Sequence, residues 1–137
     1  VKAAQVSAAA TKARGERASK KIKEYAKAET GEALMFIASA DAAIASGNLG
    51  EAKRDLDKAA AQLKATGAKN TGIDYSYAQL YDKLATREKD PAKKIKLLEQ
   101  AQKAYQRFAR SGAGGRVQRA TDRANEIAED IKELGPQ

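Results

Sequence analysis

The chain has 137 residues, of which 42% are hydrophobic, and a formal net charge of +8. This length suits one domain with a modest core, and the positive charge favours acidic partners. The chain contains neither Cys nor His, which excludes thiolate and imidazole catalysis and nearly all ordinary zinc, copper and haem sites.

The composition favours helix almost throughout the chain. Ala, Lys, Glu, Gln, Arg and Leu dominate, and these are the best helix formers, whereas the β-branched and aromatic residues that favour strands are sparse. Because so much of the hydrophobic content is Ala, we expect a thin core between paired helices. We therefore predict an all-α fold of five or six antiparallel amphipathic helices, arranged as helical hairpins or as an elongated bundle.

The first predicted element is a basic helix or arm over residues 1–28, which precedes a helical-hairpin domain over residues 29–137. The apolar residues of the arm are small, so it has little surface to bury. It is either an exposed terminal helix or a segment that lies on a nucleic acid, an anionic membrane surface or a partner protein. Its cations include Lys12, Arg14, Arg17, Lys20, Lys21, Lys23 and Lys27.

The second predicted helix, over residues 29–47, is the most apolar segment of the chain, and we expect it to be the most buried. Apolar residues recur at helical spacing between Ala33 and Ile44, and Gly47 ends the helix. Asp41 is the one carboxylate inside this apolar run. We expect it on the polar side of the helix or bonded to a neighbouring helix end.

The third predicted helix completes a hairpin with the second. Asn48 is placed to cap its start, and Glu51, three residues later, predicts a capping box. Apolar residues then form a stripe with helical spacing, which we expect to face the core. The stripe consists of Leu49, Ala52, Leu56, Ala59 and Leu63.

Three more helices are predicted after this hairpin. Thr71 with Asp74 opens the fourth after a turn-rich connection. The fifth starts at Asp90-Pro91, because Asp is a good cap and Pro is tolerated at the first helical position. A glycine-rich linker, interpreted as a simple turn and alternatively as a hinge, leads to the sixth. The linker contains Gly112, Gly114 and Gly115, and Gly135 with Pro136 ends the last helix.

The turn between the second and third helices reads Gly-Asn-Leu-Gly-Glu-Ala over residues 47–52 and continues to Lys58-Ala59. This segment resembles the turn and second helix of a tetratricopeptide repeat, and the resemblance covers about residues 33–65. The helix starts at Asn48 and Asp90 are 42 residues apart, compared with the 34-residue period of that repeat. A second likeness, over residues 42–63, is to the YfdX family of small helical bacterial proteins. The first resemblance implies protein binding, and the second implies an exported protein.

The fifth predicted helix carries a basic face opposite its apolar residues Ile95, Leu98 and Tyr105. At 100° per residue, its cations fall within about 100° of one another, and Glu99 is the only acid beyond the cap. The face is either a solvated surface or a docking strip for an acidic protein or a polyanion. Its members are Lys93, Lys96, Lys103, Arg107 and Arg110.

Three tyrosines lie in the fourth predicted helix. Tyr77 shares a face with the apolar residues of that helix and is expected in the core. Tyr75 and Tyr81 are expected near a groove between the second and fourth helices. We take Tyr75, Tyr81 and the basic face as the candidate partner-binding residues.

Catalytic and metal sites are not expected. Carboxylates of the sixth helix lie at the spacing of ordinary surface ion pairs, such as Arg119 with Asp122 and Arg123 with Glu126. No loop gathers oxygen ligands for a hard cation. We therefore predict no enzyme activity, no cofactor and no metal.

We interpret the protein as a non-catalytic protein–protein interaction module, an accessory subunit or adaptor that docks a partner with an acidic surface. One alternative is binding of nucleic acid or another polyanion, and a second is a self-assembling structural protein or homo-oligomer. The most apolar segment, residues 33–45, is too short and too interrupted for a membrane span, so we expect a soluble protein. Because the chain begins at Val1 rather than Met, export followed by signal cleavage stays open, and no compartment is assigned.

Overall fold

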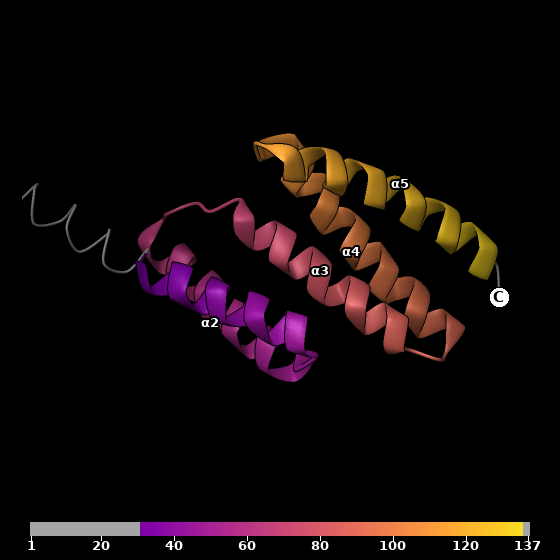
Figure 1. Ribbon diagram of the computed structural model, residues 1–137, viewed down its shortest axis with the longest axis horizontal. Coiled ribbons are helices and arrows are strands. Elements are labelled where there is room, and N and C mark those ends of the chain that lie inside the picture. The colour runs from indigo at the N-terminus through magenta and orange to yellow at the C-terminus, as the bar shows by residue number, and fades with distance from the viewer. Residues whose placement is uncertain (1–30, 136–137) are drawn as a thin grey trace, which may run out of the picture.

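The structure is a computed structural model that describes residues 31–135 (Figure 1). A helix covers residues 31–46, followed by α2 (Leu49–Thr66), α3 (Gly72–Arg87), α4 (Pro91–Ser111) and α5 (Gly115–Leu134). This part of the chain contains no strand, which confirms the predicted all-α fold. The predicted basic arm over residues 1–28 lies outside the described residues.

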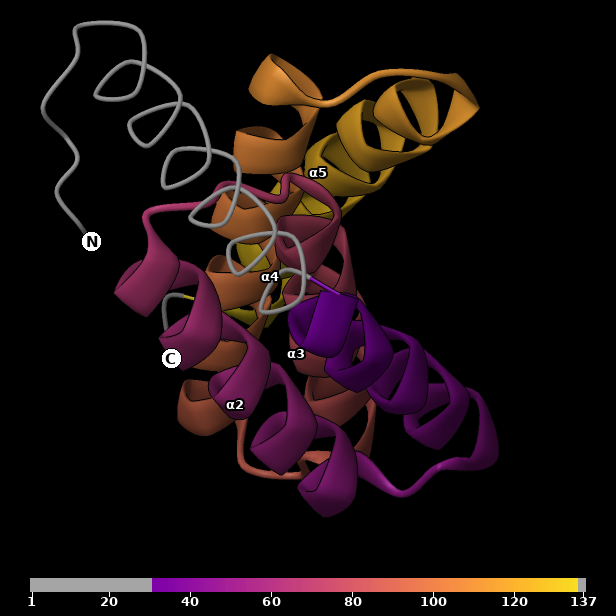
Figure 2. The same cartoon turned by 90° about the vertical axis from the view of Figure 1, so that its left-hand side faces the viewer.

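The helices follow one another as antiparallel neighbours, with α3 in the middle of the molecule. Figure 1 shows the hairpin of residues 31–46 and α2 on one side of α3, and α4 and α5 on the other. The view from the end in Figure 2 shows the same order. Helix α3 packs extensively on α4 and also contacts α2, while α5 packs on α4. Short connections enforce this arrangement, because they leave each helix only its neighbour to pack against.

The first core cluster lies between the hairpin and α3. The predicted apolar stripe of the third helix is confirmed, because all five of its residues are buried. They pack against the buried face of the 31–46 helix and against Leu80 of α3. Leu56 and Leu80 have no exposed surface at all. The cluster consists of Ala33, Ile37, Ala40, Ala43, Ile44, Leu49, Ala52, Leu56, Ala59, Leu63 and Leu80.

The second core cluster joins α3, α4 and α5. Its large residues include Leu98 and Phe108 of α4 and Ile127 of α5, which is fully buried. Ala120 and Ala124 of α5 are also buried, and such small side chains let helix axes approach closely. Tyr77 of α3 packs against both clusters. Helix α3 therefore packs against both core clusters and joins them into one structure.

The predicted turn chemistry is only partly right. Asp90 caps α4 as predicted, because its side chain accepts a hydrogen bond from the Lys93 backbone N–H at 3.1 Å. The predicted capping box at Asn48 and Glu51 is wrong, since the Asn48 side chain makes no capping bond. The Asn48 backbone N–H, which Glu51 would need, already donates to the Ala43 carbonyl at 2.8 Å. The end of the 31–46 helix has therefore already accepted the hydrogen bond that Glu51 would need.

Two other connections follow the predicted pattern. Gly47 ends the 31–46 helix with φ +87, a left-handed conformation that favours glycine. The linker of Gly112 to Gly115 is a turn between tightly packed helices, as predicted. A Cβ atom on Gly112 would lie 2.7 Å from the Phe108 carbonyl oxygen, so this glycine allows a close approach.

The 31–46 helix is less buried than predicted. Leu34 and Met35 are 50% and 73% exposed, and they are the exposed large hydrophobic side chains of the described residues. The helix is apolar around most of its circumference, but only the face with Ala33, Ile37 and Ile44 has a neighbour in this part of the chain. Within residues 31–135, no helix combines the length and apolarity that a membrane crossing requires.

Candidate binding surfaces

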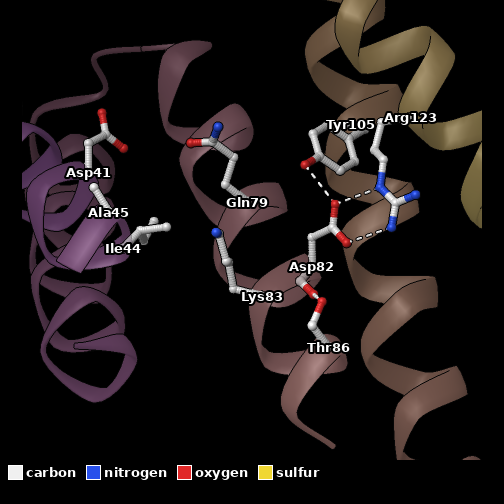
Figure 3. A pocket seen from close by; sticks show the side chains of 9 residues that line it. All are labelled: Asp41, Ile44, Ala45, Gln79, Asp82, Lys83, Thr86, Tyr105 and Arg123. Carbon is white, nitrogen blue, oxygen red and sulfur yellow. Dashed lines mark hydrogen bonds and ion pairs between the residues drawn. The ribbon is translucent and has the colours of Figure 1, made fainter. Parts of the chain in front are cut away.

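A polar cleft lies between the 31–46 helix and α3, where the sequence predicted a groove. Its volume is about 470 Å³. Figure 3 shows Asp41 on the left, Gln79 and Lys83 of α3 in the middle, and Tyr105 and Arg123 on the right, at the opposite side of α3. Asp41 bonds to a neighbouring helix rather than to a helix end, because it accepts a 2.6 Å hydrogen bond from Ser76 of α3. This bond places the carboxylate in the middle of the apolar helix against a buried hydroxyl.

Asp82 forms a polar cluster that joins three helices. Its Oδ2 accepts hydrogen bonds from Arg123 Nε of α5 at 2.8 Å and from the Tyr105 hydroxyl of α4 at 3.0 Å. Its Oδ1 accepts from Arg123 Nη2 at 2.8 Å (Figure 3). Such a two-pronged arginine–carboxylate pair is both strong and geometrically specific. The cluster therefore sets the position of α5 relative to α3.

The ionisation of these groups follows from the same contacts. The hydrogen bond to Asp82 raises the pKa of Arg123, so the guanidinium stays charged. Burial, and then the negative charge of Asp82, raises the pKa of the Tyr105 phenol above its ordinary value of 10.0. Both oxygens of Asp82 accept hydrogen bonds from neighbouring helices, so this carboxylate is a structural anchor.

The polar cleft does not contain the predicted tyrosines. The expectation that Tyr75 lies at this groove is wrong, because Tyr75 is only 8% exposed and its ring packs against Tyr105 and Phe108 of α4. Tyr81 is half-buried and stacks on Tyr77, with ring centroids 6.1 Å apart. The position of Tyr75 was misjudged because α3 is covered on two faces rather than one, whereas the role of Tyr81 in partner binding stays a prediction.

The predicted basic face of α4 is exposed along its whole length. Lys93, Lys96, Lys103, Arg107 and Arg110 are all exposed. Its two ends, however, have different surroundings. Lys93 and Lys96 lie near the capping Asp90, and the same end of α4 has Lys94 in a cleft with Asp130 and Glu133 of α5. The C-terminal part of the face meets the starts of α3 and α5 instead.

That C-terminal region, which we call the basic end, gathers cations from four segments. Helix α2 ends there and α3 begins there, and Arg107 Nε of α4 bonds Asp74 Oδ1 of α3 at 3.2 Å, which places the two helix ends together. Three carboxylates accompany six exposed cations: Asp74, Asp122 and Glu32, which accepts a 2.8 Å hydrogen bond from Gln62 near the end of α2. The cations are Lys64 of α2, Lys69 of the α2–α3 connection, Arg107 and Arg110 of α4, and Arg116 and Arg119 of α5.

A second hollow, which we call the turn cavity, adjoins the basic end. It has a volume of about 510 Å³ and lies between the end of α2, the α2–α3 connection, the start of α3 and the end of α4. Arg107 belongs both to the basic end and to the cavity wall. Burial, and then a hydrogen bond to Asp57, raises the pKa of the Tyr77 phenol in this wall. The lining residues include Ala60, Leu63, Ala68, Lys69, Asn70, Ile73, Asp74, Tyr77 and Arg107.

Sequence reasoning missed both the turn cavity and the cluster at Asp82. It placed Arg123 in a surface pair with Glu126, and this pair does form, with Arg123 Nη1 and Glu126 Oε1 3.3 Å apart. The shorter bonds to Asp82, 41 residues earlier, had no local signal. The other predicted pair is replaced, because Asp122 accepts from Gln118 at 2.8 Å. Only the fold brings Asp82 of α3 next to Arg123 of α5.

Potential metal ligands do not cluster in the described part of the chain. Within residues 31–135, no three potential ligands gather in a way that would hold a metal ion. The predicted absence of enzyme activity stays a prediction. No protein-family model, curated protein or solved structure matches the chain. The resemblances to the tetratricopeptide repeat and to the YfdX family therefore also stay predictions.

Proposed function

We propose that the protein is a non-catalytic interaction module that docks the acidic surface of a partner protein at its basic end. The observation that carries this proposal is the gathering of six exposed cations, accompanied by three carboxylates, at the meeting point of four chain segments. One of these carboxylates, Asp74, is already bonded to Arg107. Long-range attraction between such a surface and an acidic partner speeds their encounter and orients the complex.

The chemistry of the surrounding surface favours a protein partner over a nucleic acid. Proteins that bind single strands stack bases on exposed aromatic rings. Of the tyrosines that the structure describes, Tyr75 and Tyr105 are buried, and Tyr77 and Tyr81 are half-buried and stacked on each other. The ring of Phe108 is buried as well. Within residues 31–135, the basic end therefore offers charge and an adjoining cavity but no exposed aromatic platform for bases.

The resemblance of residues 47–59 to a tetratricopeptide repeat also supports protein binding. In this proposal, the paired helices form a scaffold, and the core clusters hold the ends of α2, α3, α4 and α5 in a fixed arrangement. An adaptor or accessory subunit needs only such a preorganised surface, because preorganisation lowers the entropic cost of binding.

Two charge-reversal variants with the same net charge test the proposal. Arg110→Glu with Arg119→Glu alters the basic end, and Lys93→Glu with Lys96→Glu alters the opposite end of α4. All four residues are exposed, so both variants are expected to fold. The protein and each variant are used for native co-purification at low and at high salt, with the bound material identified by mass spectrometry and ultraviolet absorbance. The affinity for the isolated partner is then measured.

We expect the basic-end variant to lose the partner and the matched control to retain most of its affinity. The affinity of the unmodified protein should fall with salt, because exposed charges are screened. Equal losses in both variants would mean that net charge alone matters and would reject the basic end as the docking surface. Recovery of nucleic acid as the main bound material would favour the polyanion alternative instead.

A further inference from the structure

We infer that the turn cavity is an anchor pocket, which receives one large apolar side chain from an acidic segment of the partner protein. This inference rests on the proposed function and specifies the chemistry of the partner. Protein interfaces commonly concentrate their binding energy in one apolar anchor that fills a pocket, surrounded by a polar rim. The turn cavity and the basic end have this relationship to each other, since Arg107 belongs to both.

The cavity walls favour an apolar occupant. Leu63, Ile73 and the ring of Tyr77 contribute apolar surface, together with Ala60 and Ala68. Each is either part of the first core cluster or packed against it, with the exception of Ala60, which lies beside the buried Ala59 on α2. The wall thus continues the hydrophobic core to the surface. An apolar side chain that lies in this open hollow would cover part of the apolar wall and remove it from water.

Three polar side chains of the same walls already have partners. Asn70 Oδ1 accepts the Gly72 backbone N–H at 2.8 Å, and the Tyr77 hydroxyl donates to Asp57 at 2.7 Å. Asp74 is bonded to Arg107. An apolar side chain that enters the cavity leaves these bonds intact, so it does not leave these polar groups buried without a partner.

The rim selects an acidic segment around that anchor. Arg107 contacts Asp74 through Nε, and its two terminal nitrogens make no hydrogen bond to a described residue. Lys69 also has no hydrogen-bond or ion-pair partner among residues 31–135 and is exposed. Arg110 follows one turn after Arg107 on the same helix. Carboxylates on both sides of the anchor would meet these cations, because arginine and lysine pair readily with carboxylates.

The test uses two synthetic peptides of equal charge, made of glutamate and glycine, which differ only at a central leucine or alanine. A third peptide with glutamine in place of glutamate is the uncharged reference. Binding to the full chain is measured at low salt by the changes in the NMR chemical shifts of its backbone amides. Burial of a leucine side chain corresponds to about a 10- to 100-fold difference in dissociation constant. We expect the leucine peptide to bind more tightly by that factor, with the largest signal changes around the cavity.

A cavity-filling variant and a matched control locate the anchor. Ala60→Phe places a ring in the cavity, whereas Ala61→Phe adds the same ring at the next, exposed position of α2. Both are first checked for folding by circular dichroism. Ala60→Phe should remove the preference for leucine over alanine, and Ala61→Phe should preserve it. A second filling variant, Ala68→Phe in the α2–α3 connection, serves if Ala60→Phe does not fold.

The possible failures are distinguishable. If both acidic peptides bind equally to the unmodified protein, or if the filled variants keep the preference for leucine, the anchor pocket is rejected while charge-based docking survives. If neither acidic peptide binds better than the glutamine reference, or if Arg110→Glu with Arg119→Glu changes nothing, the proposed function itself fails.

Discussion

Replacement of Asp82 by Asn should destabilise the fold more than any comparable carboxylate-to-amide change on the surface. The substitution preserves the size of the side chain but removes its charge. It also turns one acceptor oxygen into a donor, which then faces the Tyr105 hydroxyl or the Arg123 guanidinium. Three hydrogen bonds that join α3, α4 and α5 are weakened or lost together.

The expected magnitude follows from the exposure of the pair. Hydrogen bonds to charged groups contribute about 1.5–3 kcal/mol each when well shielded. The Asp82 side chain is 17% exposed and that of Arg123 is 31% exposed, so water screens part of this energy. Arg123 also keeps contacts with Glu126 at 3.3 Å and Asp130 at 3.4 Å. We therefore expect a loss of about 2–3 kcal/mol in the free energy of unfolding.

The assay is urea unfolding followed by far-ultraviolet circular dichroism, because urea is uncharged and does not screen the pair. Asp122→Asn is the matched control: Asp122 is exposed and accepts one hydrogen bond from Gln118, so its replacement should cost less than about 0.5 kcal/mol. Adding Arg123→Gln to Asp82→Asn completes a double-mutant cycle with an expected coupling of about 1–2 kcal/mol. If Asp82→Asn costs no more than Asp122→Asn, the cluster does not anchor α5.

Two further predictions use the same unfolding assay. Leu56→Ala should lower the free energy of unfolding by about 2–5 kcal/mol, because Leu56 is fully buried in the first core cluster. Leu34→Ala, at a half-exposed position, should lower it far less. Similar losses in the two variants would show that the wrong face has been placed in the core. The raised pKa of Tyr105 contributes stability that is present below its ordinary value of 10.0 and is lost as the pH rises above it, because the unfolded tyrosine ionises first. Stability should therefore fall more steeply above pH 10 in the unmodified protein than in Tyr105→Phe, and parallel pH profiles would contradict this account.

Local sequence patterns predicted the helices well. Asp90 with Pro91 marks the start of α4, and Gly47 marks the end of the 31–46 helix, because both act through the backbone of their immediate neighbours. The buried stripe that includes Leu56 was also visible, since a period of about 3.6 residues defines one face. The capping box at Asn48 failed for a reason beyond this local pattern: the preceding helix end had already used its N–H.

The candidate sites were predicted less well. Exposure of the basic face of α4 followed from its helical spacing. Tyr75 was misplaced, because a helix that lies between two layers has two buried faces, and a single apolar stripe does not reveal the second. The exposure of Leu34 and Met35 has the converse cause, since an apolar helix is buried only where a neighbour covers it.

The sequence by itself determined the all-α class, the helix boundaries to within a few residues and the apolar faces, because these depend on interactions between residues close in the chain. The tertiary structure alone decided that Asp82 meets Arg123, that Arg107 meets Asp74, and that cations from α2, α4 and α5 gather at one end. Such contacts join residues more than thirty positions apart. They depend on which helices become neighbours, and charges leave no periodic trace of their distant partners in the sequence.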